Sequence, residues 1–177
     1  PGPVSDHLRV GGLKMTLDNG WGTIFNWEPA DLTATIGRAN EAGWQKPVLI
    51  QFQRTWEDAL AIAKQTRKPI LVCINMDGEI ASEHYAGVRY RNPESAALYE
   101  PYVCVIASVY RHTPRDHDDE GKRILCPRFG SVTCGEHIAI EPFLYEKFMN
   151  GRRISPRHIC VETDNLSETF DVFYTWD

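Results

Sequence analysis

The sequence has neither a long apolar stretch nor a run of basic residues. Its longest apolar stretch, around Tyr102–Tyr110, is far shorter than the roughly 18 residues that a membrane-spanning helix needs. Lysine and arginine number 19 against 24 aspartates and glutamates, which gives a net charge of -5. This balance lacks the electrostatic attraction on which nonspecific binding to nucleic acid depends. We therefore expect no membrane span in this chain and no nucleic-acid partner.

The common nucleotide-binding and catalytic motifs are also missing. The sequence contains no Gly-x-Gly-x-x-Gly, no phosphate-binding P-loop, no Gly-x-Ser-x-Gly and no His-Glu-x-x-His. These patterns mark dinucleotide-binding, triphosphate-binding, serine-hydrolase and zinc-protease sites. Because these motifs are absent, we do not expect the chain to have the common functions that they indicate.

The start of the chain and its cysteine count bear on location. The chain begins with Pro1-Gly2-Pro3 and carries no basic leader, so we expect a processed piece of a longer protein. Five cysteines are an odd number, so at least one lacks a disulfide partner in the chain, which suits a reducing interior. A removed leader suits export instead. The compartment stays unknown, with an extracytoplasmic location, periplasmic or secreted, favoured over the cytoplasm.

The sequence is long enough for one domain with a hydrophobic core, preceded by an N-terminal extension. Residues 1–46 are expected to form the N-terminal extension, rich in glycine up to about residue 25 and with one helix over Pro29–Asn40. Residues 47–177 are expected to form the folded domain. No internal repeat is present.

Hydrophobic periodicity predicts alternating strands and helices from residue 48 onward. The expected strands cover 48–53, 70–75 and 102–110, and the expected helices cover 56–64, capped by Thr55, and 82–99, broken near Asn92-Pro93. This alternation predicts an α/β fold with right-handed crossovers and a parallel sheet core. Further on we expect a long functional loop over 111–140, a short helix over 141–150 with Pro142 in its first turn, and strands over 157–162 and 170–176.

From about Val48 to its end the chain resembles the thioredoxin-like superfamily. The resemblance is carried, in order, by Trp56-Glu57-Asp58-Ala59-Leu60 with Ala63-Lys64, Lys68-Pro69-Ile70-Leu71-Val72, Tyr102-Val103-Cys104-Val105, Gly151 to Pro156, and Arg157-His158-Ile159-Cys160-Val161. It implies a mixed sheet sandwiched by helices, with Pro156 as the cis-proline that precedes an antiparallel strand. It also implies that residues 111–140 are an insertion before that strand.

The Cys-x-x-Cys pair of that superfamily is missing here. Its two cysteines would fall near Glu79 and Ser82. Disulfide exchange needs an attacking thiolate and a second, resolving thiol, which a carboxylate and a hydroxyl do not supply. The family's usual activity is therefore not expected at these positions. A second departure is that no final helix follows the last predicted strand.

Cysteines and histidines at short spacing lie downstream instead, in Cys126-x7-Cys134-x2-His137. Two thiolates and an imidazole suit tetrahedral zinc or copper(I), and His158, His112 or His84 would be the fourth ligand. Zinc is placed ahead of copper because no methionine lies near this loop. The alternatives are a local disulfide between the two cysteines, or two unrelated thiols. The other cysteines, Cys73, Cys104 and Cys160, sit in apolar runs and are expected in the core.

The predicted topology brings several of these groups to one rim. His84 would lie near the start of a helix after a central strand, and His112 just past the carboxyl end of the neighbouring strand, where open α/β sheets bind ligands. Glu79 and Glu83 are four apart and are the candidate catalytic carboxylates. The alternative for such acids is stabilisation of a helix N-terminus.

Three functions are compatible with these features. The first is a zinc- or copper-binding thioredoxin-like domain without classical disulfide oxidoreductase activity. The second is a thiol-disulfide oxidoreductase that uses Cys126 and Cys134. The third is a non-catalytic module that holds a protein partner, or a small-molecule substrate, in the crevice. Whether the chain is an enzyme is left open.

Overall fold

The computed structural model describes residues 7–10, 13–16 and 46–173. Two short strands, β1 (His7–Val10) and β2 (Leu13–Thr16), pair in an antiparallel manner within the N-terminal extension. The predicted helix over Pro29–Asn40 lies outside the described residues, as does the end of the last predicted strand.

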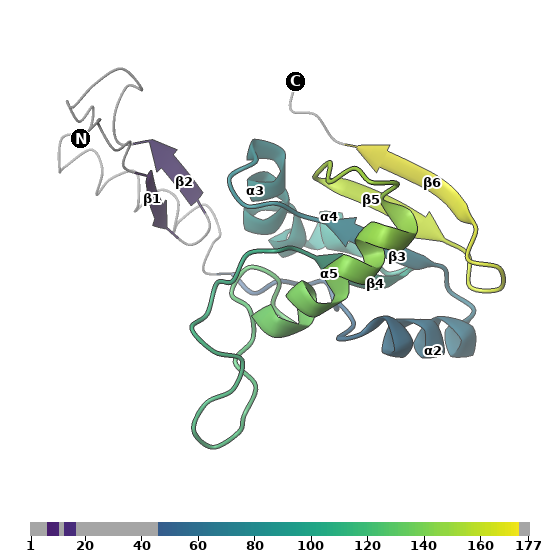
Figure 1. Ribbon diagram of the computed structural model, residues 1–177, viewed down its shortest axis with the longest axis horizontal. Helices are drawn as coiled ribbons and strands as arrows, with labels where there is room; N and C mark the ends of the chain where they lie inside the picture. The colour runs from purple at the N-terminus through teal and green to yellow at the C-terminus, as the bar shows by residue number, and fades with distance from the viewer. Residues whose placement is uncertain (1–6, 11–12, 17–45, 174–177) are drawn as a thin grey trace.

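The core of the domain is a mixed four-stranded open sheet in the order β4-β3-β5-β6 (Figure 1). Its strands are β3 (Ile70–Ile74), β4 (Val103–Ala107), β5 (Arg157–Val161) and β6 (Glu168–Phe173). The pair β3 and β4 is parallel, whereas β5 runs antiparallel to both β3 and β6. Every residue of β3, β4 and β5 is buried, as expected of near-continuous apolar strands in the middle of a sheet. The α/β class and the mixed sheet are thus as predicted.

Helices cover both faces of this sheet. They are α2 (Trp56–Thr66), α3 (Ile80–Gly87), the single 3-10 turn η2 (Arg89–Arg91), α4 (Pro93–Ala97) and α5 (Cys134–Phe148). Thr55 caps α2, since its hydroxyl accepts the backbone N–H of Asp58 at 3.1 Å. Asn92 caps α4 in the same way and interrupts the helical segment before Pro93. Both features confirm the sequence prediction.

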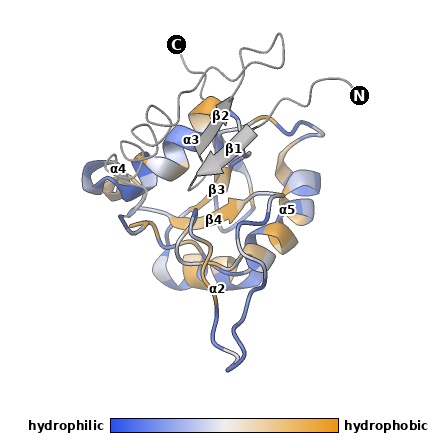
Figure 2. Ribbon diagram, turned by 90° about the vertical axis from the view of Figure 1, so that its left-hand side faces the viewer, coloured by the Kyte–Doolittle hydropathy of each residue, from blue (hydrophilic) through white to orange (hydrophobic). Residues whose placement is uncertain are grey.

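Alternating side chains of the strands divide the core in two. On one face Ile70 and Val72 pack with Trp56 of α2 and with Leu144 and Phe148 of α5. On the other face the cysteines of the strands pack with aromatic residues, among them Phe52, Tyr85, Tyr90 and Phe129. Cys73, Cys104 and Cys160 are at most 3% exposed, which confirms their expected place in the core. Figure 2 shows the apolar β3 and β4 at the centre between these helices.

Two elements differ from the prediction. The strand expected over 48–53 is reduced to one parallel bridge between Phe52 and Cys104. The helix expected to begin at Glu141 begins at Cys134, so the inserted loop ends at residue 133, and Pro142 lies inside the helix. The cause is a capping box, in which Thr133 and Glu136 satisfy each other's free backbone N–H groups. This local signal prevailed over the preference of proline for a first turn.

Three further observations complete the fold. The Ser155-Pro156 peptide bond is cis and directly precedes β5, as the resemblance implied for Pro156. Among the described residues, no helix combines the length and the apolar character needed to cross a membrane. The loop between β4 and α5 projects away from the sheet (Figure 1).

Candidate metal centre

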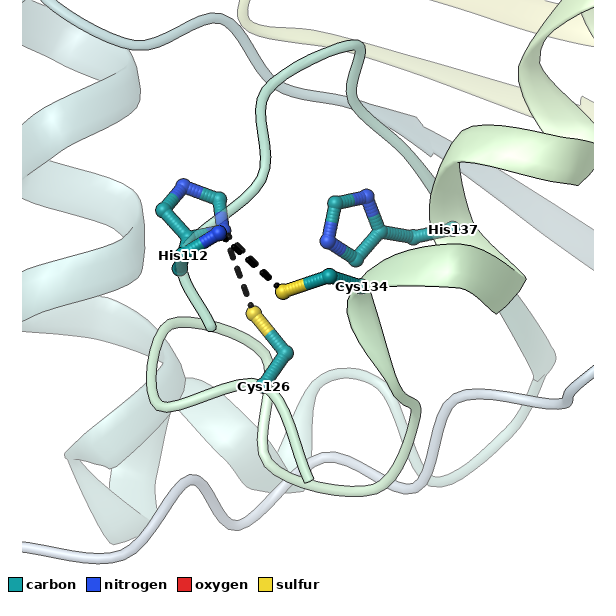
Figure 3. A group of neighbouring side chains, drawn as sticks. All are labelled: His112, Cys126, Cys134 and His137. Carbon is teal, nitrogen blue, oxygen red and sulfur yellow. Dashed lines mark hydrogen bonds between the residues drawn. The ribbon is translucent and has the colours of Figure 1, made fainter. Parts of the chain in front are cut away.

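Four side chains converge at the base of this loop: His112, Cys126, Cys134 and His137 (Figure 3). One nitrogen or sulfur atom from each lies within 4.8 Å of the others. The Nδ1 atom of His112 is 3.3 Å from the sulfur of Cys126 and 3.8 Å from that of Cys134. The structure thus brings together the three residues predicted from the Cys-x7-Cys-x2-His spacing and one of the three proposed fourth ligands.

These distances can be compared with the spacing of ligand atoms around a tetrahedrally coordinated ion. With zinc-sulfur bonds near 2.3 Å and zinc-nitrogen bonds near 2.0–2.1 Å, neighbouring ligand atoms stand about 3.3–3.8 Å apart. The two distances from His112 to the sulfurs, 3.3 and 3.8 Å, fall in this range. These two distances are therefore compatible with a shared ion, and all four ligand atoms lie within 4.8 Å of one another.

The helix α5 supplies two of the four groups. Cys134 is its first residue and His137 its fourth, and residues three apart lie on the same face of a helix. The capping box of Thr133 and Glu136 determines where the helix starts and hence where both groups point. Glu136 also pairs with Arg54 at 2.7 Å and with Arg123, which ties the helix start to two other segments.

Cys126 is held by a tight turn. The backbone N–H of Gly130 donates to the carbonyl of Cys126 at 2.8 Å, and Gly130 has a positive φ of 76°. A Cβ at Gly130 would stand 2.7 Å from the Cβ of Val48, closer than two carbon atoms can pack. Glycine is therefore needed here both for its backbone conformation and for the approach of residue 48.

His137 is positioned as a ligand through its Nε2 atom. The side chain is buried, and its Nδ1 lies 3.0 Å from the backbone carbonyl of Ser108. A carbonyl only accepts, so Nδ1 carries the proton and Nε2 is left with a lone pair. Among the described residues, Nε2 has no hydrogen-bond partner although it is buried. Metal-ligating histidines commonly donate their outer N–H to a backbone carbonyl in this manner.

His112 is held by a carboxylate. Its Nε2 atom lies 3.1 Å from Oδ2 of Asp77, while its Nδ1 faces the sulfurs. Burial acts to lower the pKa of His112, but hydrogen bonds to Asp77 and Cys134 outweigh it, and the net change is upward. The arrangement is a carboxylate-histidine pair of the kind that orients metal ligands.

Asp77 is in turn compensated by a buried cation. The side chain of Arg128 is 2% exposed and its Nε lies 3.4 Å from Oδ1 of Asp77. The same guanidinium donates to Glu83 at 2.7 Å and to the side-chain oxygen of Asn75 at 2.9 and 3.1 Å. A chain of charged contacts therefore runs from Glu83 through Arg128 and Asp77 to His112.

The sulfur of Cys134 is surrounded by donors. The backbone N–H of His112 donates to it at 3.1 Å and the hydroxyl of Thr113 at 3.3 Å. The pKa of Cys134 is lowered, first by a hydrogen bond from Cys126 and then by the neighbouring His112, His137 and Thr113, although burial opposes the change. The pKa of Cys126 is raised, because it donates that bond and is buried. All five cysteines are free thiols, so the predicted alternative of a local disulfide is not what the structure contains.

The other two histidines proposed as fourth ligands lie outside this group. His158 is on β5, where its Nε2 is 2.9 Å from the hydroxyl of Tyr99. Burial lowers its pKa to about 4, with a smaller contribution from the charge of Arg89. His84 is on α3, and its pKa is lowered by burial and then by Arg89.

The candidate catalytic carboxylates have structural partners. Glu79 caps α3, since its oxygens accept the backbone N–H groups of Ala81 at 3.0 Å and Ser82 at 2.7 Å. Glu83 accepts the N–H of Gly78 at 2.6 Å and pairs with Arg128. Glu79 therefore takes the helix-stabilising role that was the alternative to catalysis.

Sequence reasoning missed Asp77 and the carbonyl of Ser108 behind the ligands, and it did not predict that Arg128 contacts Asp77. A signal for two of them was available, because Ser108 directly follows β4 and Asp77 stands three residues after the end of β3. The carboxyl ends of neighbouring parallel strands are where ligand sites of open α/β sheets form.

Comparison with known proteins adds no assignment: no protein-family model and no curated protein matches this chain.

Proposed function

We propose that this chain is a zinc-binding domain in which His112, Cys126, Cys134 and His137 hold one ion. The observation that carries the proposal is the hydrogen bonding and orientation of the two imidazoles. Each has its outer nitrogen engaged, with Asp77 or with the carbonyl of Ser108, and has its other nitrogen directed to the cluster. A buried nitrogen without a partner, such as Nε2 of His137, is costly unless something binds to it.

The site has the features of a structural rather than a catalytic zinc centre. Structural sites are closed by four protein ligands, whereas catalytic sites keep one position open. Cys126, Cys134 and His137 are each at most 1% exposed, which leaves little access for a substrate. The ligands come from the loop that follows β4 and from α5, so a bound ion would tie the loop to the helix and to the end of the sheet. Metal binding and folding of this region are then the same event.

Zinc is proposed ahead of copper because of the ligand set. Two thiolates with two imidazoles form a standard tetrahedral zinc site. Copper(I) favours soft ligands, thiolate and thioether, whereas two of the four ligands here are imidazoles.

The oxidoreductase alternative has less support. A redox-active pair needs a thiolate that a substrate disulfide can reach, followed by attack of the second thiol. Cys126 is 1% exposed and Cys134 is 0% exposed. Both sulfurs also lie close to Nδ1 of His112, at 3.3 Å from Cys126 and 3.8 Å from Cys134.

A thioredoxin-like architecture without its redox pair is part of the same proposal. The strand order β4-β3-β5-β6, the antiparallel β5 and the cis-Pro156 before it support this architecture. The capping role of Glu79 and the burial of Ser82, where the redox cysteines would stand, support the loss of the usual activity.

The test is metal analysis of protein purified without added metal. We expect one zinc per chain, lost in Cys134→Ser and in His137→Ala. Cys160→Ser is the matched control, because Cys160 is an equally buried thiol outside the cluster and should leave the zinc content unchanged. Cobalt(II) substitution should give the absorption bands of a tetrahedral thiolate site. Protein that is fully folded, metal-free and indifferent to added zinc would contradict the proposal.

A further inference from the structure

A second candidate site lies beside the α3–α4 segment. It is a cleft of about 230 Å³ between the α3–α4 segment and the strands β3, β5 and β6. None of the four proposed metal ligands lines it. A molecule bound there would therefore not contact the proposed metal ligands.

The walls of the cleft are aromatic. Tyr85, Tyr99, Tyr102 and Phe170 line it, together with the imidazole of His158. Tyr85 and Tyr99 stand with their ring centres 5.3 and 5.6 Å from that of His158, and Tyr102 stands 6.3 Å from Phe170 at nearly a right angle. Aromatic side chains of this kind are common in the walls of pockets that hold planar ligands.

A cation stands in the same cleft. The guanidinium of Arg89 lies over the ring of Tyr85, 5.1 Å from its centre, and Arg89 lines the cleft. Among the residues that the structure describes, no carboxylate pairs with Arg89. Its charge acts on two neighbours, since it contributes to the lowered pKa values of His84 and His158. The cleft therefore offers a positive site beside an aromatic wall.

The interior also holds one polar pair. The hydroxyl of Tyr99 is 2.9 Å from Nε2 of His158, and both side chains line the cleft. A few convergent polar groups in an otherwise apolar and aromatic pocket are the usual composition of a small-molecule site. Since drug-sized ligands occupy pockets of roughly 300–1,000 Å³, a cleft of about 230 Å³ suits a smaller molecule.

We infer that this cleft binds a small aromatic carboxylate, with its ring among the tyrosines and Phe170 and its carboxylate on Arg89. The guanidinium supplies the bidentate, charge-assisted contact that carboxylates prefer. The flat ring replaces water against the aromatic walls.

The test is a binding titration of the zinc-loaded protein followed by fluorine NMR, with 4-fluorobenzoate as the probe. The neutral amide, 4-fluorobenzamide, has nearly the same shape and is the matched ligand control. We expect the acid to bind at millimolar concentration or below and at least tenfold more tightly than the amide. Changes in the backbone amide chemical shifts should be confined to residues of the cleft, and the signals of residues around Cys134 should not change.

Three surface variants test the proposed site, and one of them is a control. Arg89→Gln should weaken binding of the acid about tenfold and remove its advantage over the amide, while Lys64→Gln, the same loss of charge on the exposed side of α2, should change neither. Leu98 is 71% exposed at the cleft, so Leu98→Glu should fold normally and weaken binding of the acid. No binding to the wild-type protein, or equal affinity for acid and amide that Arg89→Gln leaves unchanged, would overturn the inference.

Discussion

The Nε2 atom of His112 stands 3.1 Å from a carboxylate oxygen of Asp77, and this contact decides which nitrogen of the ring faces the sulfurs. With Nε2 engaged outward, Nδ1 lies 3.3 Å from the sulfur of Cys126. The side chain of Asp77 is only 4% exposed, so the contact is shielded from water. The pair is thus a fixed support for one ligand of the proposed zinc site.

Asp77→Asn is expected to weaken zinc binding by about 10- to 100-fold, the usual effect of losing a carboxylate behind a ligating histidine. The asparagine oxygen can still orient the ring, but it lacks the charge that makes the imidazole a better donor. The measurement is zinc competition with a chromophoric chelator at constant pH. Asp119→Asn is the control, since Asp119 has a side chain 78% exposed, and its affinity should equal that of the wild type. Equal affinities of both variants would refute a supporting role for Asp77.

Arg128→Met is expected to destabilise the protein by about 3–5 kcal/mol, because it leaves buried carboxylates without their cation. The guanidinium is 2% exposed and contacts both Glu83 and Asp77. Denaturant unfolding measures the change in the free energy of unfolding. The double variant with Glu83→Gln should recover part of the loss, since one uncompensated charge is removed with it.

Arg115→Met provides the comparison for that experiment. Arg115 pairs with Asp119 at the surface, with side chains 54% and 78% exposed. Exposed pairs of this kind contribute about 0–1 kcal/mol, so this variant should unfold almost like the wild type. Similar losses in Arg128→Met and Arg115→Met would contradict the account of a buried charge network.

Gly130→Ala and Gly121→Ala separate backbone strain from steric conflict. Both glycines have positive φ, 76° and 80°, so each alanine should cost about 1 kcal/mol from its conformation alone. At Gly121 the added methyl meets nothing within 4 Å, whereas at Gly130 it stands 2.7 Å from Val48. Gly130→Ala should therefore cost a further 1–3 kcal/mol or so, as overpacking does. Equal thermal stability of the two variants would show that the side chain of Val48 can move aside without a loss of stability.

The buried His158 makes the stability of the folded protein depend on pH. Its folded-state pKa of about 4 lies below the ordinary value of 6.5, so the unfolded chain binds a proton first as the pH falls. Stability from this group is complete above about pH 6.5, declines between 6.5 and 4, and is lost below that. A difference from 6.5 to about 4 corresponds to about 3 kcal/mol.

Comparing the wild type with His158→Gln isolates that contribution, because other acid-sensitive groups are shared. Denaturant unfolding at several values between pH 4 and 7 should show a steeper fall for the wild type. Parallel curves for the two proteins would mean that His158 does not titrate as its burial requires.

Much of the domain follows from local sequence signals. Thr55 and Asn92 mark helix starts where the structure has them, and the apolar run Ile70–Ile74 is a fully buried strand. The start of α5 was mispredicted although Thr133 and Glu136 form a readable capping pattern, because Pro142 was taken as a first-turn residue. Proline is tolerated inside this helix at the loss of one backbone hydrogen bond.

The candidate metal site could be predicted from local sequence signals only in part. Cys134 and His137 are three apart, so their common direction follows from the helix alone. His112 reaches them across 22 residues, a placement set by the path of the loop, and spacing does not distinguish it from His84 or His158. His158 lies on β5, two strands from β4 in the sheet order, and two strand spacings are about 10 Å, too far for a shared ion.

The central claim is that one zinc ion has two sulfur and two nitrogen neighbours in this chain. X-ray absorption at the zinc edge of the purified protein measures that set of neighbours directly. We predict two sulfur atoms at about 2.3 Å and two nitrogen atoms at about 2.0–2.1 Å, with one sulfur lost in Cys126→Ser. A zinc spectrum with only oxygen and nitrogen neighbours, or one that Cys126→Ser leaves unchanged, would contradict the account.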